Sequence, residues 1–101
     1  MYAVGPIRFD WDDGKAAANK RKHGVSFAEA KTVFLDEEAL LLADPDHSED
    51  EERFALLGLS ASFRVLVVCH CYRQGDDVIR IISARKADRD EQAEYNRRWR
   101  R

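Results

Sequence analysis

An arginine inside an aliphatic run is the residue of this sequence that most needs a chemical explanation. Arg80 lies in the run 78–82, which is otherwise made of bulky apolar residues. Because an unpaired charge is costly to bury, its guanidinium must face water, a carboxylate or an anionic ligand. Two interpretations stay open. Arg80 is either a sheet-surface arginine paired with an acid such as Asp76, Asp77 or Glu52, or an arginine that binds an anion.

A hydroxyl group and two further cations follow directly after this run. Ser83, Arg85 and Lys86 lie where strand-like sequence passes into helix-like sequence. Such a transition places phosphate-binding groups on rigid backbone at the edge of a sheet, although a basic pair beside a helix is more often a solvated surface. Regular strand alternation puts Ser83 and Arg85 on the side opposite Arg80, unless a bulge near the strand end changes the order.

Three histidines are candidates for proton transfer, because the pKa of free imidazole lies near neutral. His23, at the predicted end of a helix beside Lys22, is a candidate acid or base, or it interacts only with the C-terminal dipole of that helix. His70 lies in a strand-like run of aliphatic residues, so a satisfied core histidine is the favoured interpretation. His47 lies in an acidic stretch and is interpreted as solvated.

The sequence gives little support to a metal or a nucleotide cofactor. Cys69, His70 and Cys71 have side chains that zinc prefers, but consecutive strand residues point to alternating faces and cannot converge on one ion. The acidic stretch lacks the ordered ligands and the turn glycine of a calcium loop. No phosphate-cradling glycine loop, dinucleotide motif or G-x-S-x-G elbow is present. We therefore expect neither a metal nor a cofactor.

The charges are divided unequally along the chain. Residues 1–52 contain 6 Lys or Arg and 13 Asp or Glu, a net charge of −7, while residues 53–101 contain 11 and 6, a net charge of +5. Every basic residue of the second half except Lys86 is arginine, whose planar fork suits bidentate contact with phosphate or carboxylate. This bias predicts an anionic partner, unless the two halves only neutralise each other across the fold.

Periodicity, capping residues and turn residues indicate which elements position these side chains. We expect a short strand or arm over 7–11, then a helix from the cap Asp12 to His23 that ends at Gly24, then a second helix begun by a Ser26–Glu29 capping box. Four strands follow, over 39–43, 53–60, 64–73 and 77–87. A last helix is capped by Asp88 and Glu91 and carries Tyr95 and Trp99. Residues 74–77 form the clearest hairpin turn.

This order of elements predicts an α+β domain in which N-terminal helices pack on one face of a small antiparallel sheet, with a C-terminal helix after the last strand. The other face of the sheet is then free for function. A chain of 101 residues, 45% of them apolar, has material for one core, so we expect a single domain over residues 1–101.

Several features predict a cytoplasmic protein with no membrane partner. No apolar run approaches the roughly 20 residues that cross a bilayer, and the first residues lack the pattern of a cleavable leader. Cys69 and Cys71 point to the same side of a strand and are poorly placed to bridge, so we expect free thiols.

A small domain with clustered arginines, histidines and tyrosines can cleave RNA without a metal, because the 2′-hydroxyl of RNA is a built-in nucleophile. The protein then has only to position the strand, move protons and stabilise the charge on the pentavalent phosphorus. Along almost its whole length the chain resembles the BrnT toxins. The motifs that carry the resemblance are F-D-W-D, N-K-R-K-H-G-V-S-F, D-P-D-H-S, E-E-R-F, G-L-S, R-V-L-V-V and R-I-I-S-A-R-K-A.

The resemblance implies a RelE-like fold, an endoribonuclease activity that blocks translation, and neutralisation by a BrnA-type antitoxin through which alone the pair reaches operator DNA. On the matching positions, we expect Arg80 and Arg85 to bind and stabilise the scissile phosphate, and His23 or Tyr95 to take part in proton transfer. The residues expected to contact the RNA are Lys22, Arg53, Ser83 and Lys86.

Two other functions stay open. One is a non-catalytic protein-binding domain of a regulatory complex, in which the arginines grip an acidic protein. The other is direct DNA binding, for which a pI of about 5.9 and the lack of a recognition helix after a short turn give the least support.

Overall fold

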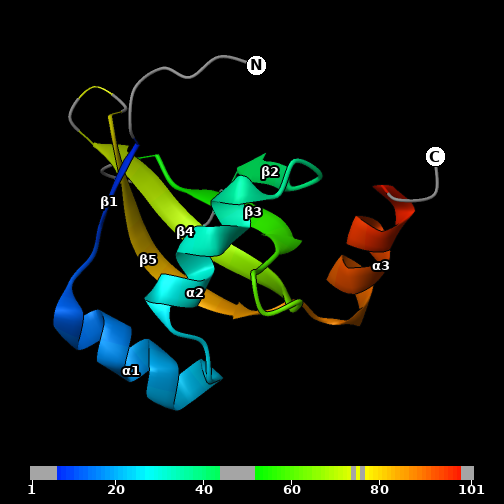
Figure 1. Ribbon diagram of the computed structural model, residues 1–101, viewed down its shortest axis with the longest axis horizontal. Helices are drawn as coiled ribbons and strands as arrows, with labels where there is room; N and C mark the ends of the chain where they lie inside the picture. The colour runs from blue at the N-terminus through cyan, green and yellow to red at the C-terminus, as the bar shows by residue number, and fades with distance from the viewer. Residues whose placement is uncertain (1–6, 44–51, 74, 76, 99–101) are drawn as a thin grey trace.

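The structure, a computed structural model, describes residues 7–43, 52–73, 75 and 77–98. Its elements follow the predicted order (Figure 1). They are β1 (Arg8–Asp10), α1 (Asp13–His23), α2 (Phe27–Thr32), the 3-10 helix η1 (Val33–Leu35), β2 (Leu40–Ala43), β3 (Phe54–Leu59), β4 (Val65–Arg73), β5 (Val78–Lys86) and α3 (Arg89–Arg98). The predictions for His47 and Trp99 fall outside the described residues.

The five strands form one mixed sheet in the order β1-β5-β4-β3-β2. Strands β2 to β5 pair antiparallel with their neighbours, as predicted. The prediction of a wholly antiparallel sheet is wrong for β1, which pairs parallel to β5, with Asp10 opposite Arg80. The alternation of side chains along a strand identifies its faces but not its neighbour, so sequence cannot show that the first and last strands pair.

The predicted caps of α1 and α2 are confirmed. The Asp12 carboxylate accepts a hydrogen bond from the Lys15 N–H at 2.8 Å, and Gly24 ends α1 with a φ of 71°. The Ser26 hydroxyl accepts from the Glu29 N–H at 3.0 Å and begins α2. The Glu29 carboxylate, however, does not complete the capping box, because it binds side chains of the β3–β4 turn.

Helix α2 and the following η1 lie over one face of the sheet, and α1 lies beside β5 (Figure 1). The main core lies between α2, η1 and the sheet. It contains Val25, Phe27, Ala30, Val33, Leu56, Leu66, Val68, Ile81 and Ala84. Gly58 permits this close packing, because a Cβ there would approach Val33 and Ala39 to 2.9 Å.

His70 lies on this helix-covered side of the sheet, so the prediction of a core histidine is confirmed. It is fully buried, and its Nδ1 lies 3.1 Å from the Val68 carbonyl, to which the neutral ring donates. The prediction that its polar atoms are satisfied holds only for Nδ1, because Nε2 is buried without a hydrogen-bond partner among the described residues. Burial lowers the pKa of His70. Its ring also contacts Phe34 edge to face, so His70 acts as a core residue.

The other face of the sheet is only partly free. Helix α3 contacts β3, and Tyr95 packs there with Leu57 and Val67 in a second, smaller core. The remainder of this second face, beyond α3, carries the candidate site.

Candidate functional site

A bulge in β5 brings three of the predicted residues to the second face of the sheet. Ser83 and Ile81 pair with consecutive residues of β4, so Ile82 is an extra residue in the ladder. Because Ile81 belongs to the helix-covered core, Arg80, Ser83 and Arg85 all face the other way. Regular alternation would have separated Arg80 from the other two.

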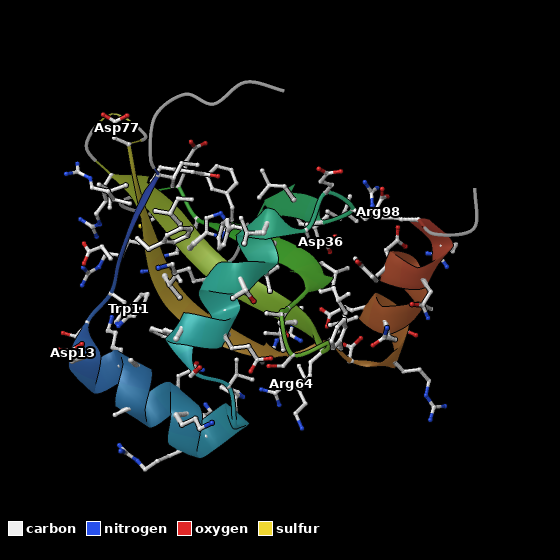
Figure 2. The ribbon with its side chains drawn as sticks, in the orientation of Figure 1. Trp11, Asp13, Asp36, Arg64, Asp77 and Arg98 are labelled. Carbon is white, nitrogen blue, oxygen red and sulfur yellow. The ribbon has the colours of Figure 1, made fainter. Side chains whose placement is uncertain are left out.

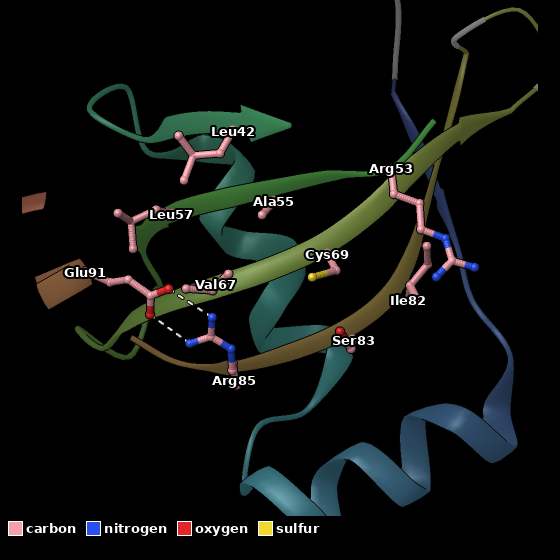
Figure 3. Close-up of a pocket in the computed structure, with 10 residues that line it drawn as sticks. All are labelled: Leu42, Arg53, Ala55, Leu57, Val67, Cys69, Ile82, Ser83, Arg85 and Glu91. Atoms are coloured by element: carbon pink, nitrogen blue, oxygen red, sulfur yellow. Dashed lines mark hydrogen bonds and ion pairs between the residues drawn. The ribbon is translucent and has the colours of Figure 1, made fainter. Parts of the chain in front are cut away.

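A pocket of about 360 Å³ lies on this second face beside α3 (Figure 3). Strands β3, β4 and β5 supply its apolar floor, and α3 supplies one wall. It is lined by Leu42, Arg53, Ala55, Leu57, Val67, Cys69, Ile82, Ser83, Arg85 and Glu91. Two guanidinium groups and one hydroxyl group therefore surround a largely apolar hollow, which is suitable chemistry for an oxyanion attached to an organic group.

Glu91 of α3 holds the Arg85 guanidinium. The Arg85 Nη1 and Nη2 donate to Glu91 Oε1 and Oε2 at 2.7 and 2.9 Å, as Figure 3 shows. This hydrogen bonding raises the pKa of Arg85 and lowers the pKa of the Glu91 carboxyl. Glu91 also forms the predicted reciprocal cap with Asp88, at 2.8 and 2.9 Å. One carboxylate therefore caps α3, ties it to β5 and occupies the arginine fork.

Arg53 lines the end of the pocket away from Glu91 (Figure 3). It stands one residue before β3, which carries it onto the same face. Within the described part of the chain, no carboxylate pairs with its guanidinium, and its Nε is buried without a hydrogen-bond partner. Arg53 is therefore a cation that an incoming anion can pair with.

Arg80 lies further along the face, outside the pocket lining. Its Nη1 donates to Asp10 Oδ2 at 2.8 Å, and 29% of its side chain is exposed. Pairing with a carboxylate is thus observed, but the observed partner is Asp10, which was not among the acids considered from the sequence, of which Asp76 lies outside the described residues. The parallel register of β1 and β5, which sets Asp10 opposite Arg80, is the reason.

Lys22 and His23 lie in a groove of about 230 Å³ on the other side of the β5 edge. Ile82 and Ser83 line both this groove and the pocket. The bulge is therefore the boundary between a pocket lined by two guanidinium groups and a groove lined by the His23 imidazole and the ammonium groups of Lys15 and Lys22.

Asn19 fixes α1 against this edge. Strand β1 pairs with residues 78–80, and no other described segment forms a strand beside the rest of β5 on that side. The Asn19 amide replaces that strand: Nδ2 donates to the Ala84 carbonyl at 2.8 Å, and Oδ1 accepts from the Ala84 N–H at 3.1 Å. Nδ2 also donates to the Val25 carbonyl at 2.9 Å. This buried amide sets the position of His23 relative to β5.

Tyr95 and Lys86 lie away from the pocket, in a separate cleft between α3 and the β3–β4 turn. The Tyr95 side chain is 2% exposed, and its hydroxyl donates to Asp36 Oδ2 at 2.6 Å. Burial acts to raise the pKa of Asp36, but hydrogen bonds from Tyr95 and the Leu59 N–H outweigh it and lower the pKa. Asp36, labelled in Figure 2, thereby joins η1, β3 and α3.

The structure does not gather all eight predicted residues in one place. Arg53, Ser83 and Arg85 share the pocket, and Lys22 and His23 adjoin it across the β5 edge. Arg80, Lys86 and Tyr95 lie outside both hollows.

Neither Cys69 nor Cys71 forms a disulfide bond, as predicted. Cys69 lines the pocket, whereas His70 is buried on the opposite side of the sheet. Within residues 7–43, 52–73, 75 and 77–98, no three His, Cys, Asp or Glu side chains stand close enough together to hold a metal ion.

Comparison with known proteins identifies the family. Residues 11–91 match the family described as "Ribonuclease toxin, BrnT, of type II toxin-antitoxin system". The chain belongs to the BrnT family. This assignment explains why a small domain has several cations around one face of its sheet, because a ribonuclease must bind a polyanion. It also makes an antitoxin partner and an RNA substrate properties of the family.

A crystal structure of the Brucella abortus ribonuclease toxin BrnT has the same fold, with a TM-score of 0.61 and 22% sequence identity. The match covers 83% of the present chain and 100% of the Brucella chain. A search among curated proteins finds no match. In the described part of this BrnT chain, no helix has both the length and the apolar character needed to span a membrane.

The sequence did not reveal the roles of two residues of this BrnT chain: Glu91, which holds Arg85, and Asn19, which binds the β5 backbone. Glu91 was recognised as a helix cap, but nothing in the spacing shows that its carboxylate also reaches Arg85. Asn19 stands among alanines and lysines in a helix whose buried side is not marked by an apolar stripe. A lone asparagine in such a helix is a weak signal, which becomes informative only when the structure shows that no described strand pairs with the second half of β5 on that side.

Proposed function

We propose that this BrnT chain is a metal-independent endoribonuclease that cleaves single-stranded RNA at the pocket on the second sheet face. The supporting observation is the meeting of Arg53, Ser83 and Arg85 in one hollow on the second face of the sheet. By cutting RNA it inhibits translation, and a BrnA-type antitoxin neutralises it.

The pocket suits one phosphodiester group of RNA. Arg53 has no described carboxylate partner and is the first cation that the phosphate meets. Arg85 then exchanges one or both hydrogen bonds to Glu91 for bonds to a phosphate oxygen, and Ser83 donates its hydroxyl. The apolar floor of Ala55, Val67 and the bulge residues accepts the ribose and excludes water, which strengthens the interactions of the guanidinium groups.

The reaction follows from the chemistry of RNA. The 2′-oxygen attacks the adjacent phosphorus, the bond to the 5′-oxygen of the next nucleotide breaks, and the products are a 2′,3′-cyclic phosphate and a 5′-hydroxyl. One proton leaves the 2′-hydroxyl and one is delivered to the departing 5′-oxygen. Negative charge accumulates on the phosphoryl oxygens in between, where Arg53 and Arg85 stabilise it.

Of the two predicted proton carriers, we propose His23 for the reaction. It stands in the groove that shares Ile82 and Ser83 with the pocket, so an RNA strand crossing the β5 edge contacts both. Tyr95 is buried and its hydroxyl donates to Asp36, so its proposed contribution is to hold α3 in position. Arg80 and Lys22 extend the cationic path along the strand and across the edge.

The antitoxin is proposed to cover the second sheet face and the groove, because both must be occupied to keep RNA from the cations. The chain itself has a pI of about 5.9 and is proposed to reach operator DNA only within the toxin-antitoxin complex. A mobility-shift experiment with operator DNA should therefore show binding by the complex and none by the toxin alone.

The decisive experiment incubates purified protein with bulk RNA in EDTA, with and without purified antitoxin. We expect fragments with cyclic phosphate ends that disappear when the antitoxin is added. Arg85→Ala and Arg53→Ala should each lower the cleavage rate at least tenfold, whereas the matched control Arg89→Ala, an exposed arginine of α3, should cleave normally. If folded wild-type protein binds the antitoxin but cuts no RNA, the endoribonuclease proposal is wrong and the non-catalytic protein-binding function is supported instead.

A further inference from the structure

A strained, exposed aromatic residue stands at the tip of the β3–β4 hairpin. Phe63 is 84% exposed and has a φ of 62°, the one positive φ of a non-glycine residue in the described part of the chain. Residues other than glycine, asparagine and aspartate adopt this backbone conformation at a cost in free energy, and residues with bulky side chains rarely do so. The fold therefore holds a large apolar ring in water at a backbone position that suits glycine better.

Hydrogen bonds fix the turn that carries this ring. The Ser60 hydroxyl accepts from the backbone N–H groups of Ser62 and Arg64 and donates to Glu29 at 2.6 Å. The backbone closes the turn, since the Phe63 N–H donates to the Ser60 carbonyl at 2.9 Å. The Arg64 guanidinium, labelled in Figure 2, also binds Glu29. Such a turn holds the Phe63 backbone in one orientation.

The ring borders a cleft of about 490 Å³ between the turn and α3. Its polar lining consists of a lysine, an arginine, two amides and a tyrosine, with no carboxylate: Arg64, Lys86, Gln92, Tyr95 and Asn96. Arg64 is neutralised by Glu29, whereas no carboxylate of the described residues pairs with Lys86.

We propose that Phe63 and this cleft form a subsite for one unpaired nucleobase of single-stranded RNA. The base stacks on the Phe63 ring, the amides of Gln92 and Asn96 meet its polar edge, and Lys86 contacts the neighbouring phosphate. This inference rests on the proposed function and extends it from the cleaved phosphate to a second contact on the same strand.

The cleft and the pocket are lined by neighbouring residues, so one RNA strand can contact both. Arg85 faces the pocket and Lys86, the next residue at the end of β5, lines the cleft. The two sites also share α3, with Glu91 in one and Gln92 in the other. A strand of a few nucleotides that passes the end of β5 therefore meets both.

The chemistry of the lining favours RNA over a protein partner. Gln92 Nε2 donates to Asn96 Oδ1 at 3.2 Å, so the two amides keep one hydrogen bond between them. An apolar protein side chain would still be buried against the Lys86 ammonium group, which would lose water without gaining a partner. A nucleotide offers each group a match: a π face for Phe63, donors and acceptors for the amides, and a phosphate for Lys86.

The test uses oligonucleotides with 2′-O-methyl groups, which cannot be cleaved, so that binding is measured apart from catalysis. One has bases, and the other has the same length and phosphates but is abasic. Fluorescence anisotropy gives the affinity of wild type, Phe63→Gly, Phe63→Trp and Leu35→Ala for each. Glycine is chosen because it accepts the positive φ, so the variant is expected to fold. Leu35, 83% exposed and outside the cleft, is the matched apolar control.

Phe63→Gly is expected to weaken binding of the base-containing oligonucleotide about 5-fold to 100-fold and to leave abasic binding unchanged. Phe63→Trp and Leu35→Ala should bind both as wild type does. Equal losses on both oligonucleotides, or none on either, overturn the subsite, as does a Phe63→Gly variant that loses antitoxin binding but keeps RNA binding. If Phe63 governs base binding while the wild type cuts no RNA, the subsite stands and the proposed nuclease function fails.

Discussion

If RNA binds at Arg85 as proposed, Glu91 competes with it for the same guanidinium group, so replacing Glu91 with glutamine is expected to strengthen RNA binding. In the structure both oxygens of Glu91 accept from the Arg85 fork. The Glu91 carboxyl has a lowered pKa because Arg85 donates to it, so it stays charged at neutral pH. A phosphate bound to Arg85 would therefore lie beside a negative charge.

The size of the effect follows from Coulomb's law. With about 6 Å between the Glu91 carboxylate and a phosphate on Arg85, the repulsion is about 0.7–1.4 kcal/mol at an effective dielectric constant of about 40–80. Dielectric constants this high apply because the Arg85 and Glu91 side chains are 44% and 27% exposed. Removing the charge should tighten binding roughly 3-fold to 10-fold. Loss of the ion pair costs about 1 kcal/mol of stability or less, since glutamine can still accept from the Asp88 N–H.

The assay measures the affinity of wild type and Glu91→Gln for the non-cleavable RNA oligonucleotide at several salt concentrations. Glu94→Gln is the matched control, because it makes the same change of charge on α3 at a residue that pairs with Arg97 outside the pocket. Its affinity should change by less than about twofold, as screening weakens longer-range interactions.

Equal changes in Glu91→Gln and Glu94→Gln would show that only net charge matters. If, in addition, Arg85→Ala bound RNA as tightly as wild type, phosphate would not bind at Arg85 and the reasoning about the pocket would be wrong.

Three further predictions concern the fold that supports the site. Asn19→Ala leaves both backbone groups of Ala84 unpaired and should lower the free energy of unfolding by about 2–3 kcal/mol in urea titrations; a loss below about 0.5 kcal/mol would contradict its role at the β5 edge. Tyr95→Phe removes the hydrogen bond to Asp36 and should cost about 1–2 kcal/mol of stability while RNA cleavage below the unfolding transition is unchanged; lost cleavage in a folded variant would assign Tyr95 to catalysis. Burial lowers the pKa of His70 below its usual 6.5, so near and below that pH the unfolded chain binds more protons than the folded chain. The free energy of unfolding, measured by urea titration, should therefore fall by about 1 kcal/mol as the pH is lowered from 7.5 to 5.5. His70→Phe should remove this part of the pH dependence.

Local sequence signals predicted most of the elements, because caps and periodicity act over a few residues. Asp12, Gly24 and Ser26 mark the ends of the helices as expected, and the strand runs have the predicted faces up to Ile81. The parallel pairing of β1 is not local, since it depends on which distant strand has a free edge. Sequence therefore could not show that Asp10, rather than a nearby acid, would pair with Arg80.

The candidate site was predictable in its residue types but not in its grouping. A single extra residue, Ile82, decides which side chains share a face, and parity arguments fail beyond such a bulge. The pattern R-I-I-S-A-R contains no mark of the bulge. The sequence predicted that Ser83 and Arg85 belong to the site. The structure adds the pairing of strands β3, β4 and β5, which places both residues in one pocket with Arg53.

The distribution of charge now has a structural explanation. Two ion pairs, Arg64 with Glu29 and Arg80 with Asp10, join the basic second half to the acidic first half, so part of the asymmetry is neutralised within the fold. Among the described residues, the pairs do not include Arg53 at the pocket or Lys86 at the cleft. Because a polyanion is expected to bind where cations lack internal partners, we expect RNA to gain most at these two positions. Covering α3 alone would not protect Arg53, which lies at the end of the pocket away from Glu91, so the antitoxin is expected to extend over the second sheet face.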